Sequence, residues 1–223
     1  MNKRVVNEEI DIEAMHKNPP YSMIIILFIG GFVALLNNTL LNIALPTIME
    51  EFSVGPSTVQ WLTTGYMLVN GVMIPASAFF ITKITNRRLF IAAMFLFSTG
   101  TALAIVSPTF VILVVARMIQ ASGAAIMMPL LMNVMLTAFP VERRGTAMGF
   151  FGLVMFTAPA VGPTLSGWIV ENYSWRLLFG LVLPFAIMTL IYGVFKLRNI
   201  TPNRDVDLDV ISMVLSALGF GGL

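Results

Sequence analysis

Arg117 stands alone as a charge inside a long apolar stretch of this 223-residue chain. If that stretch is a helix that crosses a membrane, Arg117 lies roughly nine residues from its outer end, near mid-membrane at about 1.5 Å per residue. A charge at that depth costs several kcal/mol unless it faces water or a partner, so it marks a functional site by default. Gln120 lies three residues further on the same helical face. The alternative is structural, with carbonyl groups of a neighbouring helix capping the guanidinium.

Two lines of uncharged polar side chains occur in other apolar segments, and both follow helical spacing. They are Asn38 and Asn42, at i and i+4, and Thr63, Tyr66 and Asn70, at i, i+3 and i+7. Such residues either line an aqueous cavity or hydrogen-bond one helix to another. Together with Arg117, the two lines favour a shared aqueous cavity, which we interpret as a substrate pathway.

Residues 157–167 combine small side chains with two prolines. Ala158, Gly162 and Ser166 form a stripe at i, i+4 and i+8 that permits close backbone approach. Pro159 and Pro163 each remove a backbone donor and bend a helix. We interpret this segment as a helix on which two halves of a bundle rock, with simple tight packing as the alternative.

The elements that position all these residues must be membrane helices. The chain is 57% hydrophobic and 11% charged, with a mean hydropathy of +0.88 and no Cys. A soluble domain has about 25% charged residues, so soluble classes are excluded. Open sheet edges cannot lie in lipid and the alternating pattern of a barrel is absent, so the segments are helices.

Each crossing needs about 20 apolar residues. The sequence predicts an all-α integral membrane fold with six spans at residues 22–46, 57–82, 89–107, 109–132, 146–169 and 175–195. The predicted domains are a cytoplasmic tail over 1–21, a six-helix bundle over 22–196, a cytoplasmic linker over 197–207 and the start of a seventh helix over 208–223.

The positions of Lys and Arg indicate the orientation. With the N-terminus inside, every Lys and Arg except Arg117 and Arg176 falls in cytoplasmic segments, which matches the positive-inside rule. We therefore expect a multi-pass protein of the cell membrane with a cytoplasmic N-terminus. A net charge of +2 gives no reason to expect a nucleic-acid partner.

The sequence also gives no indication of enzymatic activity. It has no nucleophile–base pair, metal-ligand spacing or phosphate-binding glycine loop, so no catalytic residue, cofactor or metal is expected. None of the six predicted spans contains a carboxylate, and the single His16 lies in the tail.

Several segments between residues 36 and 179 also form a recognisable series. They are residues 36–46, Val59-Gln60-Trp61 with Tyr66 and Leu68, residues 117–123, residues 142–147, Gly152 with Pro159, Gly162, Pro163 and Gly167, and Trp175-Arg176 with Phe179. In this order and topology they resemble the major facilitator superfamily, specifically the fourteen-helix drug:proton antiporters.

The resemblance implies roles for two further groups of residues. Pro159, Gly162, Pro163 and Gly167 match the antiporter motif of the fifth helix, and Arg87 and Arg88 match the end of the motif in the loop between helices 2 and 3. This loop departs from the pattern, with Lys83 near the position of the acid and Asn86 in place of a Gly. In helix 1, Asn37 replaces the expected Asp.

The resemblance predicts proton-coupled efflux of hydrophobic or cationic compounds, as in antibiotic resistance, across a bacterial cytoplasmic membrane. The expected partners are small hydrophobic substrates, protons, the lipid bilayer and the C-terminal half of the transporter. Because titrating carboxylates carry such protons, we expect the coupling acid on helices of that other half, with Arg117 tuning it or lining the pathway.

Transporters of this superfamily pair two six-helix halves around the substrate site. The chain is therefore expected to be an N-terminal half, either as a fragment or as a truncated gene product. The first alternative for the substrate is a neutral or amphiphilic compound. The alternative function is a non-transporting membrane scaffold or a regulatory fragment of a transporter.

Overall fold

The computed structural model describes residues 19–197 and residue 219, and this part of the chain is helical. Its elements are α2 (Tyr21–Glu51), α3 (Pro56–Val59), α4 (Trp61–Lys83), α5 (Asn86–Ile105), α6 (Phe110–Ala138), the 3-10 helix η1 (Val141–Arg143), α7 (Arg144–Asn172) and α8 (Arg176–Lys196). They supply 6 segments long and apolar enough to cross a membrane, α3 with α4 and η1 with α7 each counting as one. The predicted all-α, six-span class is confirmed, whereas the tail before residue 19, the linker after residue 197 and the seventh helix lie outside the described residues, apart from residue 219.

Several helices extend further than hydropathy predicted. The first span was predicted to end at residue 46, yet α2 continues to Glu51, and α7 continues to Asn172. The predicted spans contain no carboxylate, but the expectation does not extend to the full helices, because Glu50 and Glu51 end α2 and Glu171 lies in the last turn of α7. Hydropathy detects the part of a helix that suits lipid, whereas backbone hydrogen bonding continues past the hydrocarbon.

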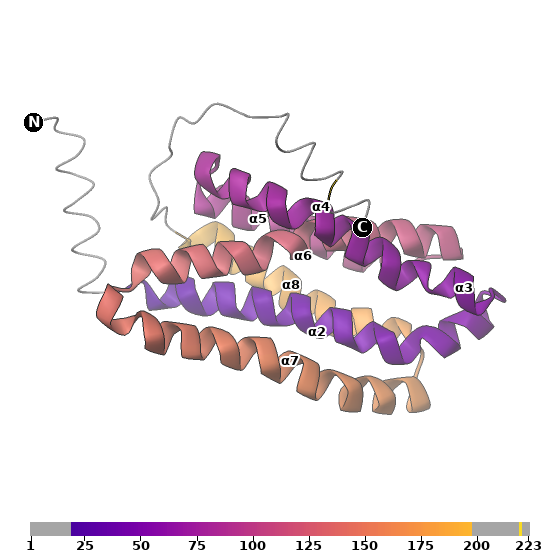
Figure 1. Ribbon diagram of the computed structural model, residues 1–223. Helices are drawn as coiled ribbons and strands as arrows, with labels where there is room; N and C mark the ends of the chain where they lie inside the picture. The colour runs from indigo at the N-terminus through magenta and orange to yellow at the C-terminus, as the bar shows by residue number, and fades with distance from the viewer. Residues whose placement is uncertain (1–18, 198–218, 220–223) are drawn as a thin grey trace, which may run out of the picture.

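Two helices, α2 and α6, form the centre of the bundle. Figure 1 shows α4, α6, α2 and α7 side by side, with α5 and α8 behind them. Helix α6 packs against α4 and α5, helix α2 packs against α7 and α8, and α2 and α6 also meet each other. Helix α7 is the least covered, since only 11% of its apolar span is buried against 61% in α2.

Glycines place α5 and α6 in backbone contact. A Cβ added to Gly100 would lie 2.5 Å from the backbone N of Gln120 and 2.6 Å from the carbonyl O of Ala116. A Cβ added to Gly123 would lie 2.7 Å from the backbone N of Phe97. Membrane helices use small residues in this way because dispersion and close backbone contact replace the hydrophobic drive. The side chains that flank the two glycines are therefore held at a fixed separation.

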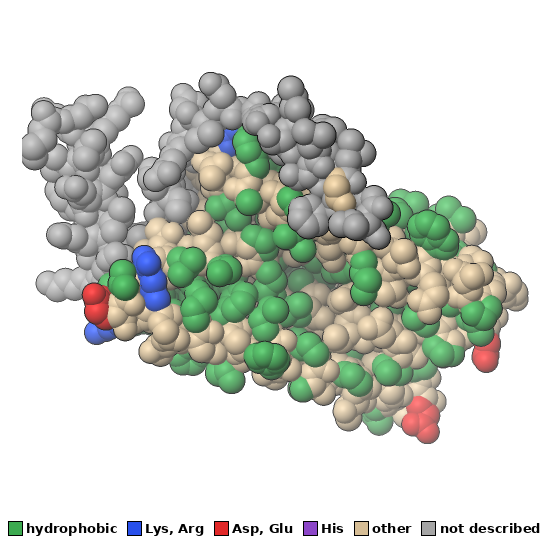
Figure 2. All heavy atoms as spheres, viewed as in Figure 1, with side chains coloured by type: hydrophobic (Ala, Val, Ile, Leu, Met, Phe, Trp, Pro, Cys, Tyr) green, Lys and Arg blue, Asp and Glu red, His purple; other side chains and the backbone are tan. Residues whose placement is uncertain are grey.

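Charged side chains lie mainly at the two ends of the bundle (Figure 2). The end that contains Tyr21, called the basic end below, carries Lys83, Arg87, Arg88, Arg143, Arg144 and Lys196 together with one acid, Glu142. The rings of Tyr21 and Phe139 meet there at a centroid distance of 6.3 Å. The opposite end, called the Glu51 end, carries Glu50, Glu51, Glu171 and Arg176. This separation suits helices whose middles lie in hydrocarbon.

Replacing Gly100 by Ala is expected to destabilise the bundle by about 1–3 kcal/mol, because the new methyl group would overlap backbone atoms of α6 that cannot move aside. Thermal unfolding of the detergent-solubilised protein measures the effect. Gly145→Ala is the matched control, since an added Cβ at Gly145 meets nothing within 4 Å. Equal unfolding temperatures for the two variants would contradict the proposed contact.

Candidate functional site

Arg117 lies about two turns into α6 from Phe110 and is only 1% exposed. A fully buried guanidinium needs partners that replace water around its donors. Its own helix supplies one amide, and neighbouring helices supply a second amide and an aromatic ring.

Three side chains from three helices contact this guanidinium. Gln120, on α6 itself, accepts a hydrogen bond from Arg117 through its Oε1 at 2.5 Å. Asn38 on α2 accepts a longer one through its Oδ1 at 3.4 Å. The ring of Tyr66 on α4 lies beneath the guanidinium, with its centroid 4.2 Å from Cζ. Asn38, Tyr66, Arg117 and Gln120, all predicted pathway residues, thus lie in contact, and their role in a pathway stays a prediction.

The network extends to a fourth helix through a residue that the sequence analysis missed. Gln120 donates from Nε2 to Oγ1 of Thr101 on α5 at 2.7 Å, and Thr101 is 0% exposed. A single hydroxyl in an apolar span is common, so the sequence alone does not indicate a role for Thr101. The network of Asn38, Tyr66, Thr101, Arg117 and Gln120 is called the arginine network below.

Neutral groups surround the charge of Arg117. Among the described residues the structure contains one salt bridge, and it joins Arg176 and Glu51 at the end of the bundle. The Nε of Arg117 has no hydrogen-bond partner among the described residues. The face of the Tyr66 ring attracts the cation by its quadrupole, an interaction of about 2 kcal/mol when desolvated. The arrangement therefore holds a permanent positive charge that no carboxylate of residues 19–197 neutralises.

The remaining predicted pathway residues lie apart from this charge. Asn42 is exposed, one turn beyond the half-buried Asn38. Thr63 is half-buried, and its Oγ1 has no hydrogen-bond partner within the described part of the chain. Asn70 is half-buried and faces the Tyr66 hydroxyl one turn along α4. The structure thus joins one member of each predicted line, Asn38 and Tyr66, directly to Arg117.

The small-residue stripe of the fifth span packs inside the bundle. A Cβ on Gly162 would lie 2.8 Å from the Cβ of Thr39, and the Ser166 hydroxyl donates to the carbonyl O of Leu40 at 2.6 Å. Both contacts are with α2. The predicted close approach is confirmed, and it joins α7 to α2.

Other residues of the predicted antiporter motif do not take part in this contact. Pro159 and Pro163 are exposed, and α7 continues through both. Gly167 is half-buried, and a Cβ added there would meet nothing within 4 Å. They lie on the part of α7 that the bundle leaves uncovered.

The loop motif residues lie at the basic end. Arg87 donates to the carbonyl O of Val194 at 2.5 Å and so ties the start of α5 to the last turn of α8. A cation there also stabilises the C-terminal end of the α8 dipole. Arg88 is exposed.

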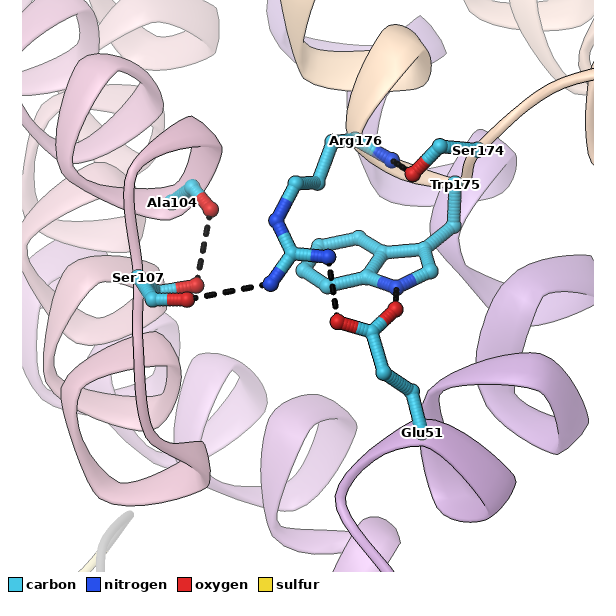
Figure 3. Close-up of polar contacts among 6 residues, drawn as sticks. All are labelled: Glu51, Ala104, Ser107, Ser174, Trp175 and Arg176. Carbon is cyan, nitrogen blue, oxygen red and sulfur yellow. Dashed lines mark hydrogen bonds and ion pairs between the residues drawn. The ribbon is translucent and has the colours of Figure 1, made fainter.

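At the Glu51 end a second polar cluster joins three helix ends (Figure 3). The indole Nε1 of Trp175 donates to Oε2 of Glu51 at 2.6 Å, and Arg176 pairs with Oε1 of the same carboxylate. Arg176 also donates to the carbonyl O of Ser107, just after α5, at 3.1 Å. This Glu51 cluster joins the ends of α2, α5 and α8.

Glu51→Ala is expected to lower the free energy of unfolding by about 1–3 kcal/mol, since the buried Trp175 indole N–H and the Arg176 guanidinium lose their shared acceptor. Thermal unfolding in detergent measures the loss. Glu50→Ala is the control, because Glu50 is exposed. If both variants unfold together with the unmodified protein, the cluster contributes nothing to stability.

Comparison with known proteins identifies the family. The family model of the Major Facilitator Superfamily matches residues 27–219, so the chain belongs to that superfamily. The membership predicted from the motifs is confirmed.

Two curated relatives come from bacteria. YcnB of Bacillus subtilis, described as an uncharacterized MFS-type transporter, is 54% identical over 89% of this chain and 42% of its own length. The lincomycin resistance protein LmrB of Listeria monocytogenes is 42% identical over 92% of this chain and 43% of its own length. The chain therefore spans less than half the length of these relatives.

Solved structures support the fold. The human organic anion transporter MFSD10 matches with a TM-score of 0.73 at 15% identity, over 89% of this chain and 53% of that one. The peptide transporter POT in complex with sulfate matches with a TM-score of 0.73 at 14% identity, over 89% of this chain and 43% of that one. The six helices thus have the arrangement of one half of a major facilitator.

Proposed function

We propose that this chain forms the N-terminal half of a proton-coupled exporter of hydrophobic or cationic compounds. The observation that carries the proposal is Arg117, a permanent charge held inside the bundle by contacts with α2 and α4 and by Gln120 of its own helix, with no neutralising carboxylate in the described part of the chain. A purely structural bundle gains little from such a residue, because an apolar side chain of similar volume packs at lower cost. The names of relatives add support, since they include a lincomycin resistance protein and the multidrug export protein EmrB of Haemophilus influenzae.

Within this proposal, polar residues near Arg117 form one wall of the substrate pathway. Asn38, Asn42, Thr63 and Asn70 supply hydrogen-bonding groups along that wall, while Tyr66, which is buried beneath the guanidinium, supports Arg117 behind it. Apolar burial with a few hydrogen bonds suits recognition of many compounds of moderate size. A neutral or amphiphilic substrate is the first alternative to a cation, because no acid contacts the network among the described residues.

The coupling proton requires a group that titrates, and Arg117 does not, because a guanidinium stays protonated in proteins. We place the coupling acid on a second six-helix half that packs on the uncovered faces of α4 and α7. Arg117 then favours the deprotonated form of that acid electrostatically whenever the two approach.

The proposed location is a bacterial cytoplasmic membrane, with the N-terminus in the cytoplasm. Support comes from the basic end, where Lys and Arg residues outnumber those of the Glu51 end.

Efflux is tested in a chimera in which this chain replaces the part of YcnB that it matches. Cells that lack other exporters are loaded with ethidium, a hydrophobic cation, and a lower accumulation than in empty-vector cells is expected. Arg117→Ala is expected to return accumulation to the empty-vector level at normal membrane abundance, because the charge that acts on the pathway is gone. Arg143→Ala, which removes an exposed arginine, is the control. Retained efflux in Arg117→Ala would make the residue structural.

The orientation is tested by labelling single cysteines, which the Cys-free sequence makes direct. In whole cells Gly55→Cys, in the turn between α2 and α3, is expected to react with an impermeant maleimide. Val141→Cys, at the basic end, is expected to react only after permeabilisation. The opposite pattern would place the N-terminus outside.

A further inference from the structure

We infer that Thr101 is a positioning residue for Arg117, acting through the amide of Gln120; the inference rests on the proposed transport role of Arg117. Thr101 lies on α5 and does not contact the guanidinium itself. Its hydroxyl determines which end of the Gln120 amide faces Arg117.

The direction of each hydrogen bond follows from the number of donors. Thr101 has one hydroxyl hydrogen, and it donates this hydrogen to the carbonyl O of Phe97 at 2.7 Å. Toward Gln120 the hydroxyl oxygen is therefore only an acceptor, so Gln120 must present its NH₂ group, at 2.7 Å. The amide oxygen of Gln120 then points to Arg117 and accepts at 2.5 Å. A reversed amide would set N–H against N–H at Arg117 and O against O at Thr101.

The hydrogen bonds from Thr101 through Gln120 to Arg117, called the relay below, cannot be replaced by water because they are buried. Thr101 and Gln120 are both 0% exposed, so solvent has no access to either side chain. If the hydroxyl is removed, the NH₂ group of Gln120 becomes a buried donor without a partner. The amide then has no reason to keep its oxygen toward Arg117.

The backbone also fixes the distance over which the relay acts. Gly100, next to Thr101, lets α5 lie against the backbone at Gln120, where an added Cβ would come within 2.5 Å of its N atom. The two helices therefore cannot slide to restore a lost contact without separating.

Arg117 depends on Gln120 more than on its other partners. The hydrogen bond to Asn38 is long, at 3.4 Å, and Nε has no partner among the described residues. The Tyr66 ring attracts the guanidinium but does not set its rotation in the ring plane. The short bond to Gln120 is thus the contact that sets the direction of the guanidinium.

The test compares Thr101→Val, which keeps the shape and removes the hydroxyl, with Thr101→Ser, which keeps the hydroxyl. In the YcnB chimera, Thr101→Val is expected to slow ethidium efflux about tenfold, which corresponds to about 1.4 kcal/mol or one hydrogen bond. Thr101→Ser is expected to stay within about twofold of the unmodified chimera, the size of an uncoupled effect.

Thr189→Val is the matched control. Thr189 is also buried and donates to a carbonyl one turn back, that of Phe185 at 2.6 Å, but lies on α8. The positioning role is supported if Thr189→Val keeps normal efflux while Thr101→Val loses efflux. Normal efflux in Thr101→Val, or equal losses in Thr101→Val and Thr101→Ser, overturns it.

A second measurement separates the relay from the transport proposal. Thermal unfolding of this chain is measured for Thr101→Val, Gln120→Leu and the double variant. If the double variant loses less free energy of unfolding than the two single variants lose together, the contact between Thr101 and Gln120 is supported. Additive losses overturn it. If the unmodified chimera fails to lower ethidium accumulation, the proposed function fails, while this cycle still decides whether Thr101 orients Gln120.

Discussion

A single buried guanidinium sets the main constraint on this bundle. Arg117 has to be desolvated, and the cost is met only where an amide, a second amide and an aromatic face converge. These groups come from α2, α4 and α6, so the three helices must keep a common register for the charge to be tolerated. In any conformational change of the bundle, these three helices must therefore move together, or Arg117 must form contacts with other groups.

Close packing of small residues makes that register possible. Gly100 and Gly123 bring α5 and α6 into backbone contact, and Gly162 lets α7 lie against the Thr39 side chain of α2. In lipid, such contacts are a main source of helix association, because apolar side chains gain little by leaving the hydrocarbon. The polar network and the glycine contacts therefore support each other: the first selects the register, and the second holds the distance.

Periodicity and hydropathy predicted much of this architecture, because lipid restricts the chain to helices of known length. Arg117, Asn38 and Tyr66 stood out because a polar residue in an apolar span needs an explanation. Thr101 did not, since a threonine can satisfy its hydroxyl within its own helix, and only the tertiary structure shows that its oxygen also serves Gln120. The helical ends at Glu51 and Asn172 were missed for a related reason: hydropathy falls at the membrane surface, while helical hydrogen bonding continues. The stripe at Gly162 was predicted to pack closely, but its partner α2 was beyond the reach of a one-dimensional pattern.

The carboxylate of Glu51 has a mechanical consequence. One oxygen binds Trp175, just before α8, and the other binds Arg176, the first residue of α8, which also holds the chain just after α5. A tilt of α2 away from α8 therefore strains both bonds at once, and the load passes on to α5 through Ser107. At this end of the molecule α2, α5 and α8 are therefore held together as one unit. The less covered helices α4 and α7 take no part in these bonds.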